Sequence, residues 1–245
     1  MENKKMGLTA EKFSYCPGCL HGVVHQLVAE VLEEMDEVDN TIGVAPVGCA
    51  VLAYKFFNCD MQEAAHGRAC AVATGIKRVR PQNTVFTYQG DGDLASIGIA
   101  ETIHAANRGE NITVIFVNNA NFGMTGGQMS PCTLLHQKTT TSPDGRDPQL
   151  HGNPIKVSEM ISQLDGPILV ARTSVTNPKN VLQTKNLIKK AFTYQKTHKG
   201  FSFVEVLSTC PINWGKKPLD AIKWLDEEMV KVYPLKIFKD IGAKA

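Results

Sequence analysis

Two polar motifs directly follow apolar segments that are predicted to be neighbouring strands. Gly90-Asp91-Gly92-Asp93 follows the apolar run 84–88, and Asn118-Asn119 follows the run 112–117. The stretch between them, 94–108, is predicted to be a helix, and a strand–helix–strand crossover returns parallel, usually beside the first strand. Both motifs then lie at the C-terminal edge of one sheet, where open α/β folds bind ligands. Hard oxygen donors, completed by phosphates and water, suit Mg²⁺, so we expect a magnesium diphosphate here.

The seven cysteines form a second group of residues with possible chemistry. Their odd number, and the lack of a secretory segment at Met1-Glu2-Asn3-Lys4-Lys5, argue against a disulfide framework and predict a reducing cytoplasm. Cys16-Pro17-Gly18-Cys19 has metal-ligand spacing. A single CxxC fits zinc, a redox dithiol or an iron–sulfur cluster, although zinc ribbons usually carry a second CxxC.

The composition predicts a compact enzyme component. The chain has 245 residues and a net charge of +2, and 43% of its residues are hydrophobic. This length is sufficient for one large domain, residues 1–245, with a full core. Lys and Arg are scattered, which gives no field for nucleic acid, and no apolar run is long enough to cross a bilayer. We therefore expect a cytoplasmic protein that binds neither nucleic acid nor membrane.

The spacing of apolar residues predicts an α/β fold with a doubly wound, mostly parallel sheet. Helical spacing predicts a helix over 20–35 and another over 62–80, which Pro81 stops. The run 41–47 is predicted to be a buried strand that delivers Gly48-Cys49 to the ligand edge. Further elements are predicted at the helix 157–164, the strand 168–174, the helix 177–196 and the strand 201–207.

Two other segments have less regular patterns. Residues 129–154 are rich in Thr, Pro, Gly and Asp without periodicity, which predicts a long loop. Loops of this length are usually functional or mobile, so we expect a flap over a cofactor or a partner contact. The tail, 214–245, is amphipathic and is expected to be an interface element rather than a catalytic one.

These motifs resemble the binding motif of thiamine diphosphate (TPP) enzymes, which combines GDG, a crossover and a double asparagine. The run 118–128, NNANFGMTGGQ, is similar to one branch of these enzymes, the β subunits of 2-oxoacid:ferredoxin oxidoreductases, most of all the 2-oxoisovalerate (branched-chain) type. The resemblance implies a TPP-binding fold, here the diphosphate-binding half. It also implies that Asp91, Asn119 and the backbone carbonyl of Asn121 bind Mg²⁺.

Three cysteine segments also resemble this family: YCPGC near the start, VGC after the first strand and TCP after the last. The resemblance implies that Cys16, Cys19, Cys49 and Cys210 hold one 4Fe–4S cluster. Four thiolates from distant segments suit such a cluster, which needs soft ligands screened from water. The alternative is that the two single cysteines are merely buried small hydrophobes. The three remaining cysteines match no ligand position.

The same resemblance assigns further residues to the cofactor. His66, in an HGRA segment like that of the family, is the candidate catalytic residue, because an imidazole can bind phosphate or move a proton near neutral pH. The alternative is a histidine in a helix cap. His21 is expected to face the diphosphate, although Leu20 replaces the glycine that relatives often have. The cofactor-binding set also contains Gly48, Cys49, Gly67, Gly90, Asp91, Gly92, Asp93, Asn119, Asn121, Gly123, Met124 and Thr125.

The chain resembles only one half of a complete TPP site. Such a site also needs a carboxylate against the aminopyrimidine, and the resemblance implies that a partner α subunit supplies this glutamate. It further implies γ and ferredoxin-like δ subunits or domains, and inactivity of the chain alone. The implied reaction is oxidative decarboxylation of a 2-oxoacid to CO₂ and an acyl-CoA, with coenzyme A as co-substrate and ferredoxin as electron acceptor.

The residues after Cys49 bear on the substrate. Relatives that act on 2-oxoglutarate often have a basic residue there, whereas this chain has Ala50-Val51-Leu52-Ala53. An apolar lining leaves a distal carboxylate unpaired, which favours 2-oxoisovalerate. The alternatives 2-oxoglutarate and pyruvate stay open, because Lys55 or Arg68 can substitute. Two rival functions also remain. The first is a cluster-free TPP decarboxylase or synthase. The second is a catalytically inert, zinc-stabilised assembly subunit, which the presence of both Asp91 and Asn119 disfavours.

Overall fold

A computed structural model describes residues 6–197 and 200–241. The first five residues, which entered the expectation of no secretory segment, and the last four of the tail lie outside the described residues. No helix in the described part is long and apolar enough to span a membrane.

Seven strands of the described chain form one sheet in the order β2-β1-β3-β4-β6-β5-β7. Neighbouring strands run parallel except for β5 and β7, which pair antiparallel. The doubly wound, mostly parallel sheet is thus confirmed, and β3 and β4 are neighbours as the crossover predicted. The strands are β1 (Thr41–Ala45), β2 (Asp60–Glu63), β3 (Thr84–Gly90), β4 (Thr113–Asn118), β5 (Pro167–Ser174), β6 (Phe201–Leu207) and β7 (Lys236–Asp240).

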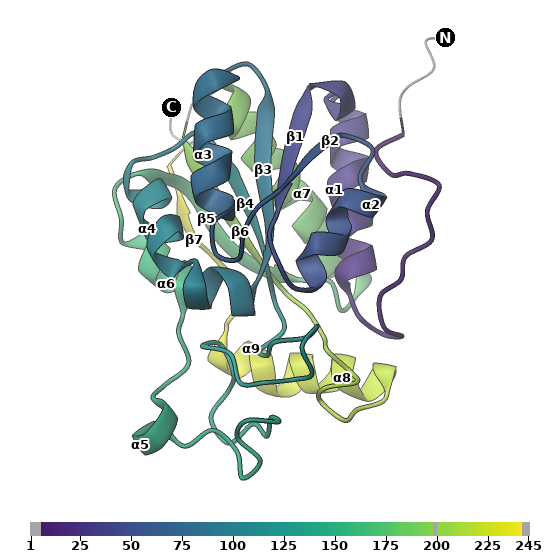
Figure 1. Cartoon of the computed structure of the whole chain (residues 1–245), viewed down its shortest axis with the longest axis vertical. Helices are drawn as coiled ribbons and strands as arrows, with labels where there is room; N and C mark the ends of the chain where they lie inside the picture. The colour runs from purple at the N-terminus through teal and green to yellow at the C-terminus, as the bar shows by residue number, and fades with distance from the viewer. Residues whose placement is uncertain (1–5, 198–199, 242–245) are drawn as a thin grey trace.

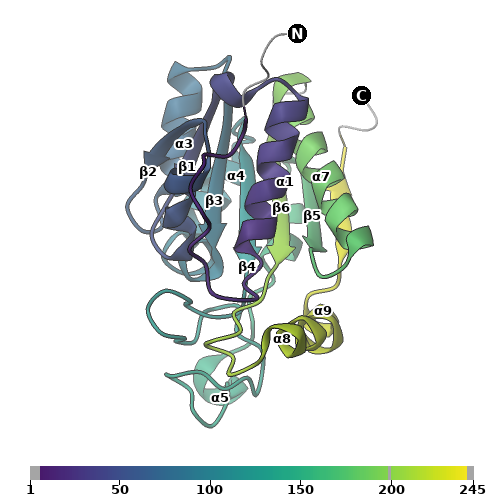
Figure 2. The ribbon, with the colours of Figure 1, turned by 90° about the vertical axis from the view of Figure 1, so that its right-hand side faces the viewer.

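Helices cover both faces of the sheet, with α3 and α4 on one face and α1 and α7 on the other (Figures 1 and 2). Strand β6 runs toward the loops that carry α5 and α8, so the C-terminal strand ends face these loops (Figure 2). The helices are α1 (His21–Glu34), α2 (Ala53–Phe56), α3 (Ala69–Val79), α4 (Ile99–Asn107), α5 (Pro148–His151), α6 (Val157–Ser162), α7 (Pro178–Thr197), α8 (Pro218–Trp224) and α9 (Val230–Val232).

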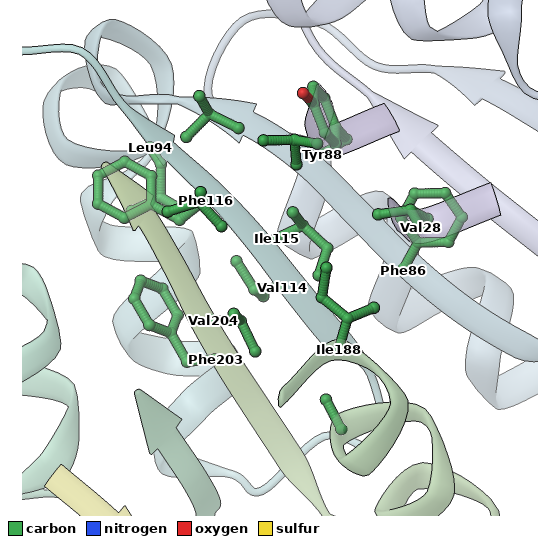
Figure 3. Packing of buried hydrophobic residues seen from close by; sticks show 14 of the residues in the cluster. Val28, Phe86, Tyr88, Leu94, Val114, Ile115, Phe116, Ile188, Phe203 and Val204 are labelled. Carbon is green, nitrogen blue, oxygen red and sulfur yellow. The ribbon is translucent and has the colours of Figure 1, made fainter. Parts of the chain in front are cut away.

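The central strands are buried along nearly their whole length, as expected for a parallel sheet covered on both faces. Their side chains meet helix residues in one core. Figure 3 shows Phe86 and Tyr88 of β3 and Ile115 of β4 in the same cluster as Val28 of α1 and Ile188 of α7. Burial on both faces explains why the sequence signal of these strands is a continuous apolar run.

The helix predicted over 62–80 is wrong in its first part. Residues Asp60–Glu63 form β2, an edge strand that pairs only with β1, and α3 begins at Ala69. Strand β2 is mostly exposed and has a polar sequence, so its conformation is set by backbone pairing with β1 and not by an apolar pattern. The helix predicted over 94–108 is also interrupted: it begins as a π-helical turn, Asp93–Ile97, and α4 starts after Gly98.

The long loop and the tail are partly ordered by the rest of the fold. Residues 129–154 contain only the short helix α5, in agreement with the predicted loop. The tail supplies β7 at the edge of the sheet, and Tyr233 packs fully buried against the core, so this segment belongs to the domain. The roles of the loop as a flap or contact, and of the tail as an interface, stay predictions.

A buried imidazole near the N-terminal end of α1 makes stability depend on pH. His25 is fully buried, its Nε2 lies 2.7 Å from the Tyr15 hydroxyl, and its ring stacks on Tyr88 at 4.4 Å. Its Nδ1 has no hydrogen-bond partner among the described residues. Burial, and then the neighbouring His21, hold the pKa of His25 well below its ordinary value.

We expect His25 to destabilise the protein in mild acid. Because the pKa is lowered only in the folded state, the unfolded chain takes up the proton below about pH 6.5, and stability is lost as the pH falls further. In urea unfolding, wild type is expected to lose roughly 1.6 kcal/mol in total between pH 6.5 and 5 relative to His25→Phe. Phe57→Leu, at a ring that packs edge-on against His25, is the control: it alters packing but no proton. Parallel curves for wild type and His25→Phe would contradict the prediction.

Candidate cofactor and metal site

The ends of β3 and β4 bring a carboxylate and an amide together. Asp91 follows β3 directly, and Asn119 follows β4. Both residues are buried, as is Asn121. The side-chain oxygen of Asn119 lies 2.8 Å from Asp91 Oδ1 and 2.7 Å from the backbone oxygen of Asn121. The structure therefore brings together the three groups that the resemblance in sequence implies as Mg²⁺ ligands.

These spacings suit an octahedral cation. Oxygens that ligate Mg²⁺ at about 2.1 Å on adjacent corners lie roughly 3 Å apart. The backbone N–H of Asn121 donates to the Asn119 side-chain oxygen at 3.3 Å, which turns this oxygen toward Asp91. Turning the amide over would instead place its NH₂ group between Asp91 Oδ1 and the Asn121 oxygen. In the first orientation the three oxygens face one another, whereas in the second the NH₂ group bridges the other two oxygens by hydrogen bonds. The first orientation, with oxygens 2.7 and 2.8 Å apart, is the one that fits Mg²⁺.

Burial makes the charge of the Asp91 carboxyl depend on a nearby cation. Burial raises the pKa of Asp91 to about 7, and the hydrogen bond that its Oδ2 accepts from Ser130 opposes this rise only in part. A bound divalent cation favours the carboxylate and reverses the effect of burial.

Backbone contacts fix the segment that carries Asn119 and Asn121. Ala120 has a positive φ of 57°, and its N–H donates to the side-chain oxygen of Asn118 at 3.1 Å. The Ala120 carbonyl accepts from Thr133 Oγ1 at 2.6 Å, and the Asn119 carbonyl accepts from Trp214 Nε1 at 3.1 Å. Two of the carbonyls are thereby engaged by Thr133 and Trp214, and that of Asn121 lies beside the Asn119 side chain, at 2.7 Å.

The first asparagine of the pair has a positioning role that its motif did not reveal. Asn118 donates from Nδ2 to Oε1 of Glu205 on β6 at 2.8 Å. Glu205 is buried and its Oε2 accepts from Arg172 Nε at 2.8 Å. Nothing in the local sequence of either strand indicates this contact, which spans 87 positions.

His66 lies before α3 and not within it. Its Nδ1 is 2.5 Å from Oδ1 of Asp93, which also accepts from the backbone N–H of Gly67 at 2.6 Å. Oδ2 of Asp93 accepts from Gln89 Nε2 at 2.8 Å. Donation of Nδ1–H to the carboxylate leaves Nε2 as the acceptor of the ring. Asp93 thus orients His66 and does not belong to the group of metal ligands.

One cavity joins nearly the whole predicted cofactor-binding set. Of those residues, all but Gly67 line it. A Cβ atom built on Gly48 or Gly90 would meet nothing within 4 Å, so their backbones are open to a ligand. By contrast, a Cβ on Gly92 would lie 2.4 Å from the Phe122 ring. Val47, Ala50 and Phe122 complete the lining and were not in the predicted set.

A second cavity is lined by Cys16, Cys19, Cys49 and Cys210. The turn Cys16–Cys19 is closed by a hydrogen bond from the Cys19 N–H to the Cys16 carbonyl, 3.0 Å. A Cβ on Gly123 would lie 3.2 Å from Cys49 Sγ and 3.7 Å from Cys210 Sγ, so a glycine leaves room beside these sulfurs. Cys59, Cys70 and Cys132 do not line this cavity.

Burial raises the pKa of three of these thiols, those of Cys19, Cys49 and Cys210, which favours their protonated form when no metal is present. Burial, opposed in part by the backbone N–H of His21, raises the pKa of Cys19 to about 12. Burial and then the neighbouring cysteines raise the pKa of Cys49 to about 11. Thiolate ligands would therefore form only with the charge of a metal centre present. Four soft donors in a partly screened cavity fit an iron–sulfur cluster.

The two cavities adjoin each other. His21, Cys49, Asn119, Gly123 and Met124 line both. His21 Nδ1 pairs with the Tyr88 hydroxyl at 2.8 Å, which fixes its ring between the two cavities. A group held by the cysteines would thus be separated from the strand-end site only by this shared wall.

The parallel sheet, with a carboxylate and an amide at neighbouring strand ends, defines an α/β protein that offers a ligand-binding site at this edge. A family profile described as "Thiamine pyrophosphate enzyme, C-terminal TPP binding domain" matches residues 46–206. The chain is 46% identical over 98% of its length to the ketoisovalerate oxidoreductase subunit VorA of Methanothermobacter thermautotrophicus, of which it covers 50%. It is 38% identical over 88% of its length to the 2-oxoglutarate synthase subunit KorB of Methanocaldococcus jannaschii, of which it covers 78%.

A solved structure agrees with these relatives. The 2-oxoglutarate:ferredoxin oxidoreductase from Magnetococcus marinus, described with 2-oxoglutarate, coenzyme A and succinyl-CoA bound, superposes with a TM-score of 0.77 at 26% identity, over 93% of this chain and 74% of that one. The chain belongs to the family of β subunits of TPP-dependent 2-oxoacid:ferredoxin oxidoreductases. It spans about half the length of the ketoisovalerate relatives that it matches.

Proposed function

We propose that this chain holds the diphosphate end of TPP and a 4Fe–4S cluster in its two adjoining cavities, and takes part in the oxidative decarboxylation of a 2-oxoacid. The observation that carries this proposal is the wall that the cavities share. Electrons that leave a substrate at the strand-end site would have only this wall to cross. A cluster-free TPP decarboxylase or synthase gives no reason for four cysteines beside the cofactor cavity.

The chain's own residues would bind and orient the groups. Asp91, Asn119 and the Asn121 carbonyl would hold Mg²⁺ against the diphosphate, and the four cysteines of the second cavity would hold the cluster. Bound TPP supplies a carbon nucleophile and the cluster supplies one-electron acceptance, which side chains cannot provide. The strand ends thus contribute charge neutralisation, position and an exit for electrons.

His66 is the residue that we assign to a proton or a phosphate oxygen. Its Nδ1 is committed to Asp93, and the ring lines the cofactor cavity. An acceptor nitrogen fixed in this way can take up a proton or receive a hydrogen bond. The cap alternative has less support, because His66 lies three residues before the first residue of α3.

The site would be completed by other subunits. Among the described residues no glutamate lines either cavity, and the carboxylates present, Asp91 and Asp93, are engaged by Ser130 and His66. We propose that an α subunit supplies the pyrimidine-side glutamate, that γ and ferredoxin-like δ subunits or domains join the assembly, and that ferredoxin and coenzyme A are the acceptor and co-substrate. The isolated chain would not turn over a 2-oxoacid.

We propose 2-oxoisovalerate as the preferred substrate. Among the described residues no Lys or Arg lines either cavity. Arg68 forms an ion pair with Glu101, and Lys55 lies over the Tyr54 ring at 5.9 Å, so neither candidate substitute lies in a cavity. Burying the second carboxylate of 2-oxoglutarate beside Ala50 and Val47 is unfavourable without a cation. The ketoisovalerate relatives are consistent with this preference.

The zinc-stabilised alternative accounts for less of the structure. A single zinc ion could use the cysteines as ligands, but it gives no reason for the adjoining cavity in which Asp91 and Asn119 meet at the strand ends.

The proposal can be tested with the chain purified anaerobically together with its partner subunits. We expect about four iron per chain and no stoichiometric zinc. With coenzyme A, ferredoxin reduction should be at least roughly tenfold more efficient in kcat/KM for 2-oxoisovalerate than for 2-oxoglutarate or pyruvate. A colourless complex that contains zinc and does not reduce ferredoxin would overturn the function. A preference for 2-oxoglutarate would overturn only the substrate.

A further inference from the structure

The Asp91 carboxylate is shared between the metal site and the long loop. Oδ1 faces Asn119, whereas Oδ2 accepts a short hydrogen bond from the Ser130 hydroxyl. Ser130 is only 1% exposed and lies 39 positions from Asp91. One oxygen is therefore available to a cation, and the other is held by a protein hydroxyl.

The direction of this hydrogen bond is set by the turn in which Ser130 lies. Ser130 Oγ already accepts from the Cys132 N–H at 3.1 Å, so its own proton points to Asp91. The Ser130 N–H donates to Thr133 Oγ1 at 2.9 Å, and Thr133 Oγ1 donates to the Ala120 carbonyl at 2.6 Å. The turn 130–133 thereby contacts both the Asp91 carboxylate and the segment that carries Asn119 and Asn121.

A buried guanidinium holds this turn against the rest of the loop. Arg146 is 4% exposed, and its recorded hydrogen bonds all go to backbone carbonyls of the loop. Nη1 reaches the turn at the Thr133 oxygen, 2.6 Å, while Nη2 reaches the Asn153 oxygen at 2.8 Å on the opposite side. Its partners are the carbonyls of Ser130, Pro131, Thr133, His151, Gly152 and Asn153. The planar, five-donor guanidinium allows this arrangement, and a lysine ammonium does not.

We propose that Ser130 is a positioning residue for the Mg²⁺-binding carboxylate, and that Arg146 fixes the loop that presents it. This inference rests on the proposed Mg²⁺ site. The Ser130 hydroxyl stops rotation of the Asp91 carboxylate and keeps Oδ1 directed at Asn119 before the metal arrives. Loss of such an outer partner typically weakens metal binding 10- to 100-fold.

The test uses the full chain assembled with its partner subunits, which complete the TPP site, and measures metal affinity directly. Mn²⁺, which prefers the same oxygen ligands, is titrated at fixed TPP, and free Mn²⁺ is followed by electron paramagnetic resonance. We expect Ser130→Ala to raise the half-saturating Mn²⁺ concentration at least about tenfold, with TPP still bound at excess metal. Ser130→Thr, which keeps the hydroxyl, should restore affinity to within roughly threefold of wild type. Thr140→Ala, at an exposed residue of the same loop, is the matched control.

The variant Arg146→Lys provides a second, independent test of the inference. It should weaken Mn²⁺ binding in the same direction and make the segment 135–150 more susceptible to proteolysis. Because both residues act on one carboxylate, the double variant Ser130→Ala/Arg146→Lys should lose less affinity than the product of the two single effects.

The outcomes separate this inference from the proposed function. Wild-type Mn²⁺ affinity in Ser130→Ala overturns the inference. The inference is also overturned if Ser130→Thr does not restore Mn²⁺ affinity and the loss of affinity in the variants parallels their loss of thermal stability. A serine with a purely structural role would behave in that way. If the wild-type complex itself binds no Mn²⁺ with TPP, the proposed Mg²⁺ site fails, and the inference fails with it.

Discussion

Asp91→Asn is expected to abolish Mg²⁺-dependent binding of TPP. The amide keeps the size of the side chain but removes the one formal negative charge among the three oxygen groups at the strand ends. Since loss of an outer partner alone costs 10- to 100-fold in metal affinity, loss of the charged ligand should cost more than about 100-fold. Calorimetric titration of TPP into the full chain at several Mg²⁺ concentrations measures the effect.

The matched control is the other carboxylate of the same motif. Asp93 is equally buried but accepts from His66, Gly67 and Gln89. Asp93→Asn should disturb His66 and leave the Mg²⁺ requirement within a few-fold of wild type. Equal losses in both variants would mean that Asp91 acts through the fold and not as a metal ligand.

Replacement of Cys210 by serine is expected to remove the iron–sulfur cluster. The wild-type chain, purified without oxygen, should contain about four iron and four sulfide, with an absorption band that dithionite bleaches. Cys210→Ser leaves three thiols and a hard hydroxyl in the cavity, so iron should fall below about one per chain. Cys49→Ser should have the same effect, because Cys49 lines the same cavity.

Cys59→Ser is the control for the cysteine prediction. Cys59 lies outside the cysteine cavity, and its sulfur is 3.8 Å from that of Met61 in β2. This variant should keep its iron and its absorption band. Iron at the wild-type level in Cys210→Ser would contradict the proposed ligand set, whatever the behaviour of the control.

Most of the sheet could be predicted because parallel strands covered on both faces are continuous apolar runs. Strands β3, β4, β5 and β6 match their predicted ranges within a few residues. Strand β2 could not be predicted, since its residues are polar and exposed and only backbone pairing with β1 defines it. Strand β7 was missed for a related reason: its amphipathic sequence resembles an interface segment, and its partner β5 lies more than 60 positions earlier.

The site residues that could be predicted are those with metal-binding side chains that follow a strand directly or within a few residues. Asp91, Asn119 and Cys49 follow β3, β4 and β1, and parallel strands deliver their ends to one edge. Ser130 and Arg146 could not be predicted, because their roles lie in contacts with Asp91 and with loop carbonyls that no local pattern encodes. Gly67 was also assigned to the cofactor; it does not line the cavity, and its N–H donates to Asp93.

The sequence by itself determined which donor atoms this protein can offer: hard oxygens after two strands, and soft sulfurs in three cysteine segments. These properties belong to the side chains and to their spacing from the strands. Only the tertiary structure decided that the cysteine cavity shares a wall with the cofactor cavity and that no Lys or Arg of the described chain lines either one. The two cavities adjoin because segments more than a hundred positions apart in the sequence pack together. The spacing of residues within a short stretch of sequence carries no information about that packing.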